Sequence, residues 1–187
     1  MPAFSLTGTY PLPGMPGATL TAGPGHVHRV VSGWFNSGRR ELAEDIETFG
    51  VGADAGPGRI KVVTFATPAG AVLLDPRATD RSRELILWIQ DIARSLTMHN
   101  APFDCPSLAI NGLFPRALVD KVHDTLVDAR LATPGNGKGM MKDLDATVER
   151  YLGLKHEPIL KLFRSLGYKS KREGFLNLDI DSSAYLF

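Results

Sequence analysis

Cysteine is nearly absent from this chain of 187 residues, in which Cys105 stands alone. A single cysteine cannot form an internal disulfide, and it cannot supply the several thiolates of a cysteine-based zinc site. We therefore expect a reducing compartment. Any bound metal must be held by oxygen or histidine ligands.

Long hydrophobic runs and an excess of one charge are also absent. No stretch is apolar enough to span a bilayer, and the N-terminus lacks the basic segment and apolar run of a signal peptide. The 21 Lys and Arg residues balance the 20 Asp and Glu residues, so net charge does not select the partner. We expect a cytoplasmic protein with no membrane partner.

The composition is that of a soluble globular protein, with 43% hydrophobic and 22% charged residues. Residues 1–38 are rich in Gly and Pro, which favours turns and extended segments over helices. We interpret them as an irregular N-terminal arm with one or two strands. Residues 39–187 are expected to form the folded domain.

From residue 39 onward, strand patterns come first and then alternate with helix patterns. Strands are expected at 39–48, 59–66, 70–75, 96–99 and 119–124, the second and third forming a hairpin. Helices are expected after Pro76 with Thr79 or Asp80 as the cap, from Pro102, from about Leu126 to Pro134–Gly137, and at 143–152 and 157–166, the last two stopped by Gly153 and Gly167. This order predicts an α/β fold with a mixed sheet flanked by helices.

Two carboxylates stand one residue apart in the first of these strands, at Asp45 and Glu47. Residues i and i+2 of a strand share a face, so both side chains should point the same way. Two neighbouring anions near a protein interior repel each other and lose hydration unless a cation or a proton intervenes. A divalent metal would meet that need.

A third carboxylate follows in the segment His99-Asn100-Ala101-Pro102-Phe103-Asp104, where a strand ends and a helix begins. Asp104 should lie in the first helical turn, near the sheet edge that carries Asp45 and Glu47. Each piece alone is a weak signal, since an Asp near a helix start usually interacts with the helix dipole. Together, in this order, they predict a metal site of oxygen ligands.

At these residues the chain resembles the DEDD superfamily of 3′–5′ exonucleases, which have the DnaQ-like, ribonuclease H-like fold. In that family an Asp-X-Glu on the first strand and an Asp in an Asn-X-X-Phe-Asp segment are metal ligands, and they match Asp45, Glu47 and Asp104. The resemblance implies a mixed sheet of five strands, three antiparallel and then parallel ones, flanked by helices.

The likeness extends to the proofreading exonuclease domain of phage and bacterial family A DNA polymerases. It rests on Asp124-Thr125-Leu126, on Lys142-Asp143-Leu144 with Tyr151-Leu152-Gly153, and on similarity over residues 162–185. It implies two Mg²⁺ or Mn²⁺ ions, the 3′ end of single-stranded DNA as substrate, and a polymerase domain that follows in the same chain or in a companion chain. The cell would be bacterial or phage-infected.

The resemblance also implies further site residues. Tyr185 would begin the family's last motif, whose Asp is expected beyond Phe187, so three carboxylates instead of four should bind metal weakly and turn over slowly or not at all. The substrate contacts that the resemblance implies are Thr48, Phe49, His99, Asn100, Phe103 and Arg130.

Structural roles compete with several of these assignments. Asn100 can bond to local backbone, Phe103 can belong to the core, His99 can be a structural histidine, and Arg130 can be an ordinary surface residue. Asp124 and Thr125 fit helix capping first. Two other functions also stay open: a non-catalytic module that binds nucleic acid or a polymerase, and an RNA exonuclease of the ribonuclease D type.

Overall fold

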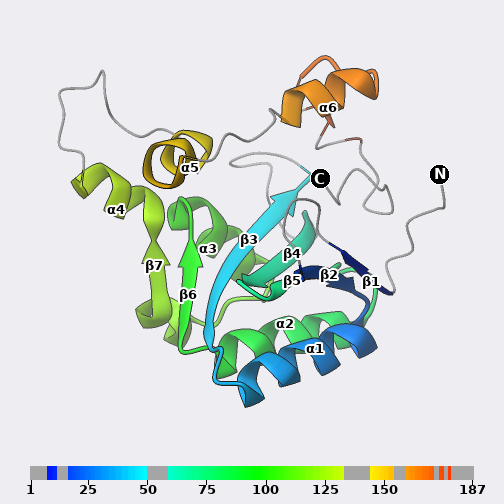
Figure 1. The fold of residues 1–187 in the computed structure, drawn as a ribbon. Helices are drawn as coiled ribbons and strands as arrows, with labels where there is room; N and C mark the ends of the chain where they lie inside the picture. The colour runs from blue at the N-terminus through cyan, green and yellow to red at the C-terminus, as the bar shows by residue number, and fades with distance from the viewer. Residues whose placement is uncertain are drawn as a thin grey trace.

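The computed structural model of the protein has a central sheet with helices packed against it (Figure 1). The residues that it describes are 8–11, 17–49, 59–132, 144–153, 159–170, 173, 174 and 177. The strands are β1 (Gly8–Pro11), β2 (Thr19–Ala22), β3 (Glu41–Thr48), β4 (Ile60–Thr67), β5 (Gly70–Leu74), β6 (Ser95–Met98) and β7 (Val122–Asp124). The helices are α1 (Pro24–Asn36), α2 (Asp80–Ile92), α3 (Ala101–Ile110), the 3-10 helix η2 (Arg116–Lys121), α4 (Thr125–Ala132), α5 (Leu144–Leu152) and α6 (Ile159–Ser165).

These strands form one sheet in the order β1-β2-β5-β4-β3-β6-β7. β3, β4 and β5 are antiparallel neighbours, and β6 and β7 continue from β3 as parallel strands. The predicted mixed sheet is therefore confirmed. It has seven strands rather than five, because β1 and β2 of the N-terminal arm join it next to β5.

The pairing of β2 with β5 depends on a glycine at position 70. The backbone of Gly70 has a φ of 144°, and a Cβ atom there would stand 2.3 Å from the carbonyl oxygen of Thr19. Only glycine allows so close an approach between the two backbones. The N-terminal arm is thus built into the sheet by a residue far from it in the sequence.

Helix α1 was not predicted from the sequence. The Gly and Pro residues of the arm favoured turns, but Pro24 occupies the first turn of α1, where its missing N–H costs nothing. Val27, Val31, Trp34 and Phe35 recur at helical spacing and are buried. Their burial against the rest of the core outweighs the weak helix propensity of the surrounding glycines.

The main core lies between the sheet and the helices α1, α2 and α3. It contains fully buried side chains from each layer, including Val31, Phe65, Ile86, Leu96 and Leu108. Burying one such aliphatic side chain stabilises a fold by about 1.5–3 kcal/mol. A smaller cluster of Leu20, Ala22, Val62 and Leu73 forms separately within the sheet.

Most local predictions are confirmed. The side chain of Thr79 caps α2 by accepting a hydrogen bond from the N–H of Ser82 at 3.1 Å. Gly153 and Gly167 follow α5 and α6 with φ values of 67° and 92°, as helix stops should. The predicted stop of α4 at residues 134–137 lies outside the described residues.

The strand predicted at 119–124 is shorter than expected. Residues 116–121 form η2, and β7 comprises only Val122–Asp124. Val119 is 54% exposed and contributes no strand face, so the pattern that included it was misleading. In the described part of the chain, no helix combines the length and the apolar character needed to cross a membrane.

Candidate active site at the carboxyl edge of the sheet

The topology carries the candidate acidic residues to one edge of the sheet. β3 runs parallel to β6, and β6 runs parallel to β7, so the carboxyl ends of these three strands meet at the same edge. Asp45 and Glu47 lie in the second half of β3, Asp104 in the first turn of α3, and Asp124 at the end of β7.

Asp45 and Glu47 share one face of β3, as the spacing predicted. Burial alternates along the strand, and the opposite face, which includes Leu42 and Ile46, is buried. Asp45 is exposed and Glu47 is half-buried, so the pair does not lie in the interior as expected. Glu47 stands opposite Val62 of β4, so the acidic pair shares the face of the smaller cluster.

The electrostatics show that the three carboxylates lie within each other's field. The pKa of Glu47 is raised to about 8, mainly by burial and also by the charges of Asp45 and Asp104, while Lys61 opposes the shift. Burial and then the charges of Asp45 and Asp124 raise the pKa of Asp104 to about 8.

For Asp45, burial raises the pKa to about 6, although a hydrogen bond from the backbone of Ile46 opposes the shift. Asp45 is exposed at the surface, yet desolvation is the main cause of its raised pKa. The two observations agree if protein atoms lie close around the carboxylate and displace part of its hydration. The exposed surface shows that a ligand can reach Asp45, and the nearby protein atoms explain why its pKa is raised. Asp45 is therefore reachable and still poorly hydrated.

Glu44 is a fourth acidic residue that the sequence analysis did not select. Only 2% of it is exposed, and its Oε1 accepts a hydrogen bond of 2.7 Å from Nε2 of Gln90 on α2. Its neighbours Leu42 and Ile46 mark the buried face of β3, so the same alternation could have predicted a buried carboxylate here.

Burial raises the pKa of Glu44 to about 8, with Asp104 and Asp45 adding to the effect and the Gln90 hydrogen bond opposing it. Among the described residues, Oε2 of Glu44 and Oε1 of Gln90 are buried without a hydrogen-bond donor. A proton on Glu44 would supply the donor that this pair lacks. Glu44 therefore fits a neutral, structural role, unlike Asp45.

The donor set fits a hard divalent cation. Asp45, Glu47 and Asp104 offer only carboxylate oxygens, and their mutual repulsion would be offset by positive charge placed between them. Within the residues that the structure describes, no group of three or more His, Cys, Asp or Glu side chains already has the arrangement of a metal site.

Asp124 has a different role from the other acids. Its Oδ2 accepts the N–H of Ala101 at 3.0 Å, and its Oδ1 accepts the N–H groups of Asn100 at 3.0 Å, Leu126 at 2.9 Å and Val127 at 3.4 Å. Desolvation alone would raise the pKa of Asp124, but these hydrogen bonds lower it below its ordinary value. The predicted capping role is confirmed, and one carboxylate serves the starts of both α3 and α4.

His99 and Thr125 form a second connection between β6 and α4. Thr125 Oγ1 donates to the carbonyl oxygen of Met98 at 3.1 Å and lies 2.9 Å from Nδ1 of His99. Because the hydroxyl proton goes to Met98, Nδ1 of His99 is the donor in the other bond. This geometry supports the structural alternative for His99.

The remaining predicted substrate contacts have different surroundings. Asn100 is exposed, with a left-handed backbone (φ 74°) and no capping bond from its side chain. Phe103 packs partly against the main core, and Thr48 is only 8% exposed. Arg130 is exposed on α4.

Phe49 is half-buried just after β3. Tyr185, the predicted catalytic tyrosine, lies outside the described residues. As substrate or catalytic residues, these six (Thr48, Phe49, Asn100, Phe103, Arg130 and Tyr185) stay predictions.

Comparison with solved structures finds nucleases. Trypanosoma brucei RNase D in complex with GMP matches with a TM-score of 0.60 and 16% identity, covering 89% of this chain and 51% of that one. The catalytic core of RRP6 from the same organism matches at 0.55 and 14%, covering 98% and 49%. The Aedes aegypti Nibbler EXO domain matches at 0.55 and 12%, covering 81% and 75%.

The chain spans about half the length of the trypanosomal RNase D and RRP6 structures. No protein-family model matches the sequence, and no curated protein matches it. At 12–16% identity, this likeness is one of fold. The chain therefore has the fold that these exonuclease structures share, which confirms the predicted ribonuclease H-like α/β class.

Proposed function

We propose that this chain is a 3′–5′ exonuclease domain that uses divalent metal ions to hydrolyse phosphodiester bonds at single-stranded 3′ ends. The observation that carries the proposal is the convergence of Asp45, Glu47 and Asp104 from separate elements, close enough to influence one another's pKa. The fold shared with exonuclease structures supports it.

Asp45, Glu47 and Asp104 are the residues that would hold Mg²⁺ or Mn²⁺, two ions in total. Such ions lower the pKa of an attacking water and stabilise charge on the phosphate and the leaving oxygen. Burial and neighbouring carboxylates raise the pKa of both Glu47 and Asp104 to about 8, so metal binding near neutral pH would release protons. The pKa of Asp45 is raised less, to about 6, so this carboxylate is the most readily ionised of the three.

Asp124 supports this arrangement without joining it. Because it binds the N–H groups of Asn100 and Ala101, it fixes the start of α3 and with it the position of Asp104. Lys61 places a positive charge near Glu47 and favours its ionised form. These two residues would order the acidic site before metal arrives.

The substrate class has two candidates. The sequence likeness to polymerase proofreading domains favours the 3′ end of single-stranded DNA, with a polymerase domain as the companion. RNA is the second candidate, favoured by the similarity in fold to Trypanosoma brucei RNase D, which was solved in complex with RNA U12. Contacts to metal and phosphate do not distinguish the two sugars unless a residue reads the 2′-hydroxyl.

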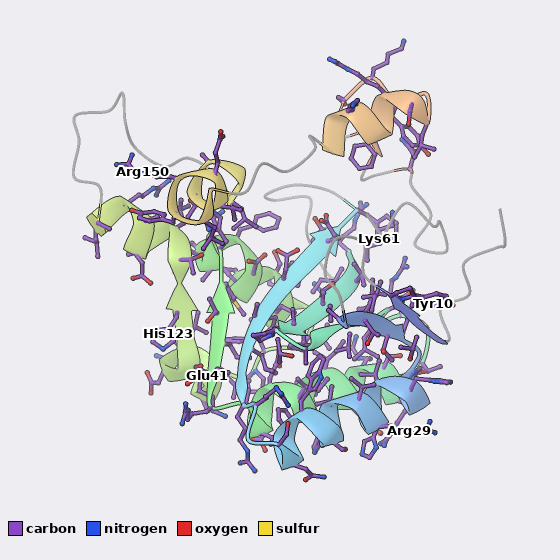
Figure 2. The ribbon with its side chains drawn as sticks, in the orientation of Figure 1. Tyr10, Arg29, Glu41, Lys61, His123 and Arg150 are labelled. Carbon is purple, nitrogen blue, oxygen red and sulfur yellow. The ribbon has the colours of Figure 1, made fainter. Side chains whose placement is uncertain are left out.

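The test combines Mn²⁺ titration calorimetry with hydrolysis of 5′-labelled DNA and RNA strands of the same sequence. The variants are Asp45→Ala and the matched control Glu41→Ala, which removes an exposed acid from the far end of the same strand. Figure 2 shows Glu41 at the opposite end of the sheet from Lys61. We expect Mn²⁺ binding in the unmodified chain and the control and its loss in Asp45→Ala.

Any hydrolysis should depend on Mn²⁺ and proceed from the 3′ end. Metal binding that survives in Asp45→Ala would contradict the site. A chain that binds strands but no metal would instead be a non-catalytic module of the same fold.

A further inference from the structure

Phe49 and Arg77 meet beside the acidic residues, at the same edge of the sheet. Phe49 follows the carboxyl end of β3, and its N–H donates to the carbonyl oxygen of Arg59 at 2.9 Å. Arg77 follows β5, which is antiparallel to β4 and therefore runs in the same direction as β3. Phe49 thus stands two residues after Glu47, and Arg77 reaches its ring from a separate loop.

The guanidinium group of Arg77 lies over the ring of Phe49, with Cζ 4.4 Å from the ring centroid. Asp75 holds it there, because Nε and Nη2 of Arg77 donate to the two carboxylate oxygens at 3.0 and 2.9 Å. The backbone N–H of Arg77 also donates to Asp75 Oδ1 at 2.8 Å. A paired carboxylate of this kind fixes the plane of the guanidinium as well as its place.

Accessibility separates Arg77 from the other cation near this ring. Nζ of Lys61 is 5.2 Å from the same centroid, but Lys61 is only 2% exposed. A β-bulge opposite Glu47 and Thr48 places Lys61 there, as bulges near active sites often re-aim a side chain. The side chain of Arg77 is 39% exposed, so of these two cations Arg77 is the one that a ligand can reach.

We propose that Arg77, supported by Phe49 and Asp75, is a stacking platform for one nucleobase of the single strand whose 3′ end enters the acidic site. The inference rests on the proposed function and adds a specific contact to it. Asp75 offsets the charge of Arg77 and uses two of its five N–H groups, and the guanidinium that lies on the Phe49 ring belongs to a side chain that is 39% exposed. Bases of single strands stack on such guanidinium planes and on aromatic rings, whatever the base.

The experiment measures strand binding in Ca²⁺, where hydrolysis is suppressed, by fluorescence anisotropy of short labelled oligonucleotides. Arg77→Ala should weaken binding about tenfold, in keeping with the value of one stacked base. Arg77→Lys, which keeps the charge beside Asp75 but loses the plane, should be nearly as weak. Arg94→Ala is the matched control, because Arg94 is also paired with an acid, Glu41, at the opposite edge of the sheet, and it should bind like the unmodified chain.

A scan of abasic sites along the oligonucleotide then identifies the contact. At one position the loss caused by Arg77→Ala should disappear, because the base that it contacts is already missing. An equal loss at every abasic position would show a phosphate contact and overturn the stacking role. Full binding by Arg77→Lys would overturn it too, and that variant carries the test if Arg77→Ala lowers the unfolding midpoint.

The outcomes also separate this inference from the proposed function. A chain that binds neither Mn²⁺ nor single strands would remove both. A chain that binds both, with affinities unchanged in Arg77→Ala and Arg77→Lys, would remove only the stacking platform.

Discussion

Asp104 and Asp124 are two aspartates that lie near each other at the same edge of the sheet, yet their surroundings shift their pKa values in opposite directions. Asp124 accepts four backbone N–H groups from the starts of α3 and α4, and its pKa is lowered. Asp104 is 3% exposed, and burial, together with the charges of Asp45 and Asp124, raises its pKa to about 8. Burial is the largest cause of the raised pKa of Asp104, whereas four backbone donors outweigh the desolvation of Asp124. This difference separates a structural acid from a candidate metal ligand.

The two acids are also linked. Asp124 binds the first N–H groups of α3, and Asp104 lies in the first turn of that helix. Asp124, whose oxygens accept hydrogen bonds, thus positions Asp104. A comparison between their variants separates loss of the metal site from loss of the fold that carries it.

The largest difference should appear in metal affinity. Asp104→Asn should weaken Mn²⁺ binding by about 100-fold or more, since loss of a ligand costs at least as much as loss of its outer-shell partner. Asp124→Asn should change it far less, because Asp124 contributes through the helix start alone. Calorimetric titration at constant pH measures both, and equal losses in the two variants would contradict the division of roles.

Stability should change in the opposite order. Asp124→Ala removes a cap shared by α3 and α4, and we expect the free energy of unfolding to fall by about 1–3 kcal/mol. Asp104→Asn should raise stability at pH 8 in the absence of metal, because it removes a buried charge without a partner. Urea unfolding in EDTA tests both; a stabilised Asp124→Ala protein would show that its hydrogen bonds are dispensable.

The pH dependence follows from the raised pKa values. Glu47 and Asp104 have folded-state pKa values of about 8, against ordinary values of 4.5 and 3.8. Between those limits the folded chain binds more protons than the unfolded chain, so these groups make stability fall as pH rises from about 4 to 8.

Mg²⁺ should reverse this loss at pH 8, because the cation replaces the protons. Thermal unfolding with and without Mg²⁺ at pH 5 and 8 measures the effect. A Mg²⁺ stabilisation that is no larger at pH 8 than at pH 5 would argue against proton release from the site.

The smallest effect is expected for Glu44→Gln. Glutamine can keep the hydrogen bond to Gln90 and cannot ionise, so the fall in stability between about pH 4.5 and pH 8 should become shallower. Mn²⁺ affinity should stay within about twofold, because Glu44 lies on the buried face of β3. A large loss of affinity would place Glu44 among the metal ligands.

Local signals predicted most of the described elements from β3 onward. The hairpin of β4 and β5, the Thr79 cap and the glycine stops each depend on neighbouring residues, and the structure confirms them. The N-terminal arm was harder to predict from the sequence, because the burial of Val27, Val31 and Trp34 depends on strands and helices that are distant in the sequence. The strand predicted at 119–124 was too long, since its first three residues belong to a 3-10 helix and only Val122–Asp124 pair with β6.

By itself, the sequence determined the spacing of Asp45 and Glu47, the placement of Asp104 at a helix start and the α/β order of elements, because these follow from backbone periodicity and helix capping. Only the tertiary structure decided that Glu44 is buried, that Asp124 caps two helices, and that Arg77 stacks on Phe49 beside the acidic site. Each of these depends on which distant atoms surround a side chain. Parallel and antiparallel strand pairing sets those neighbours, and a linear sequence does not display them.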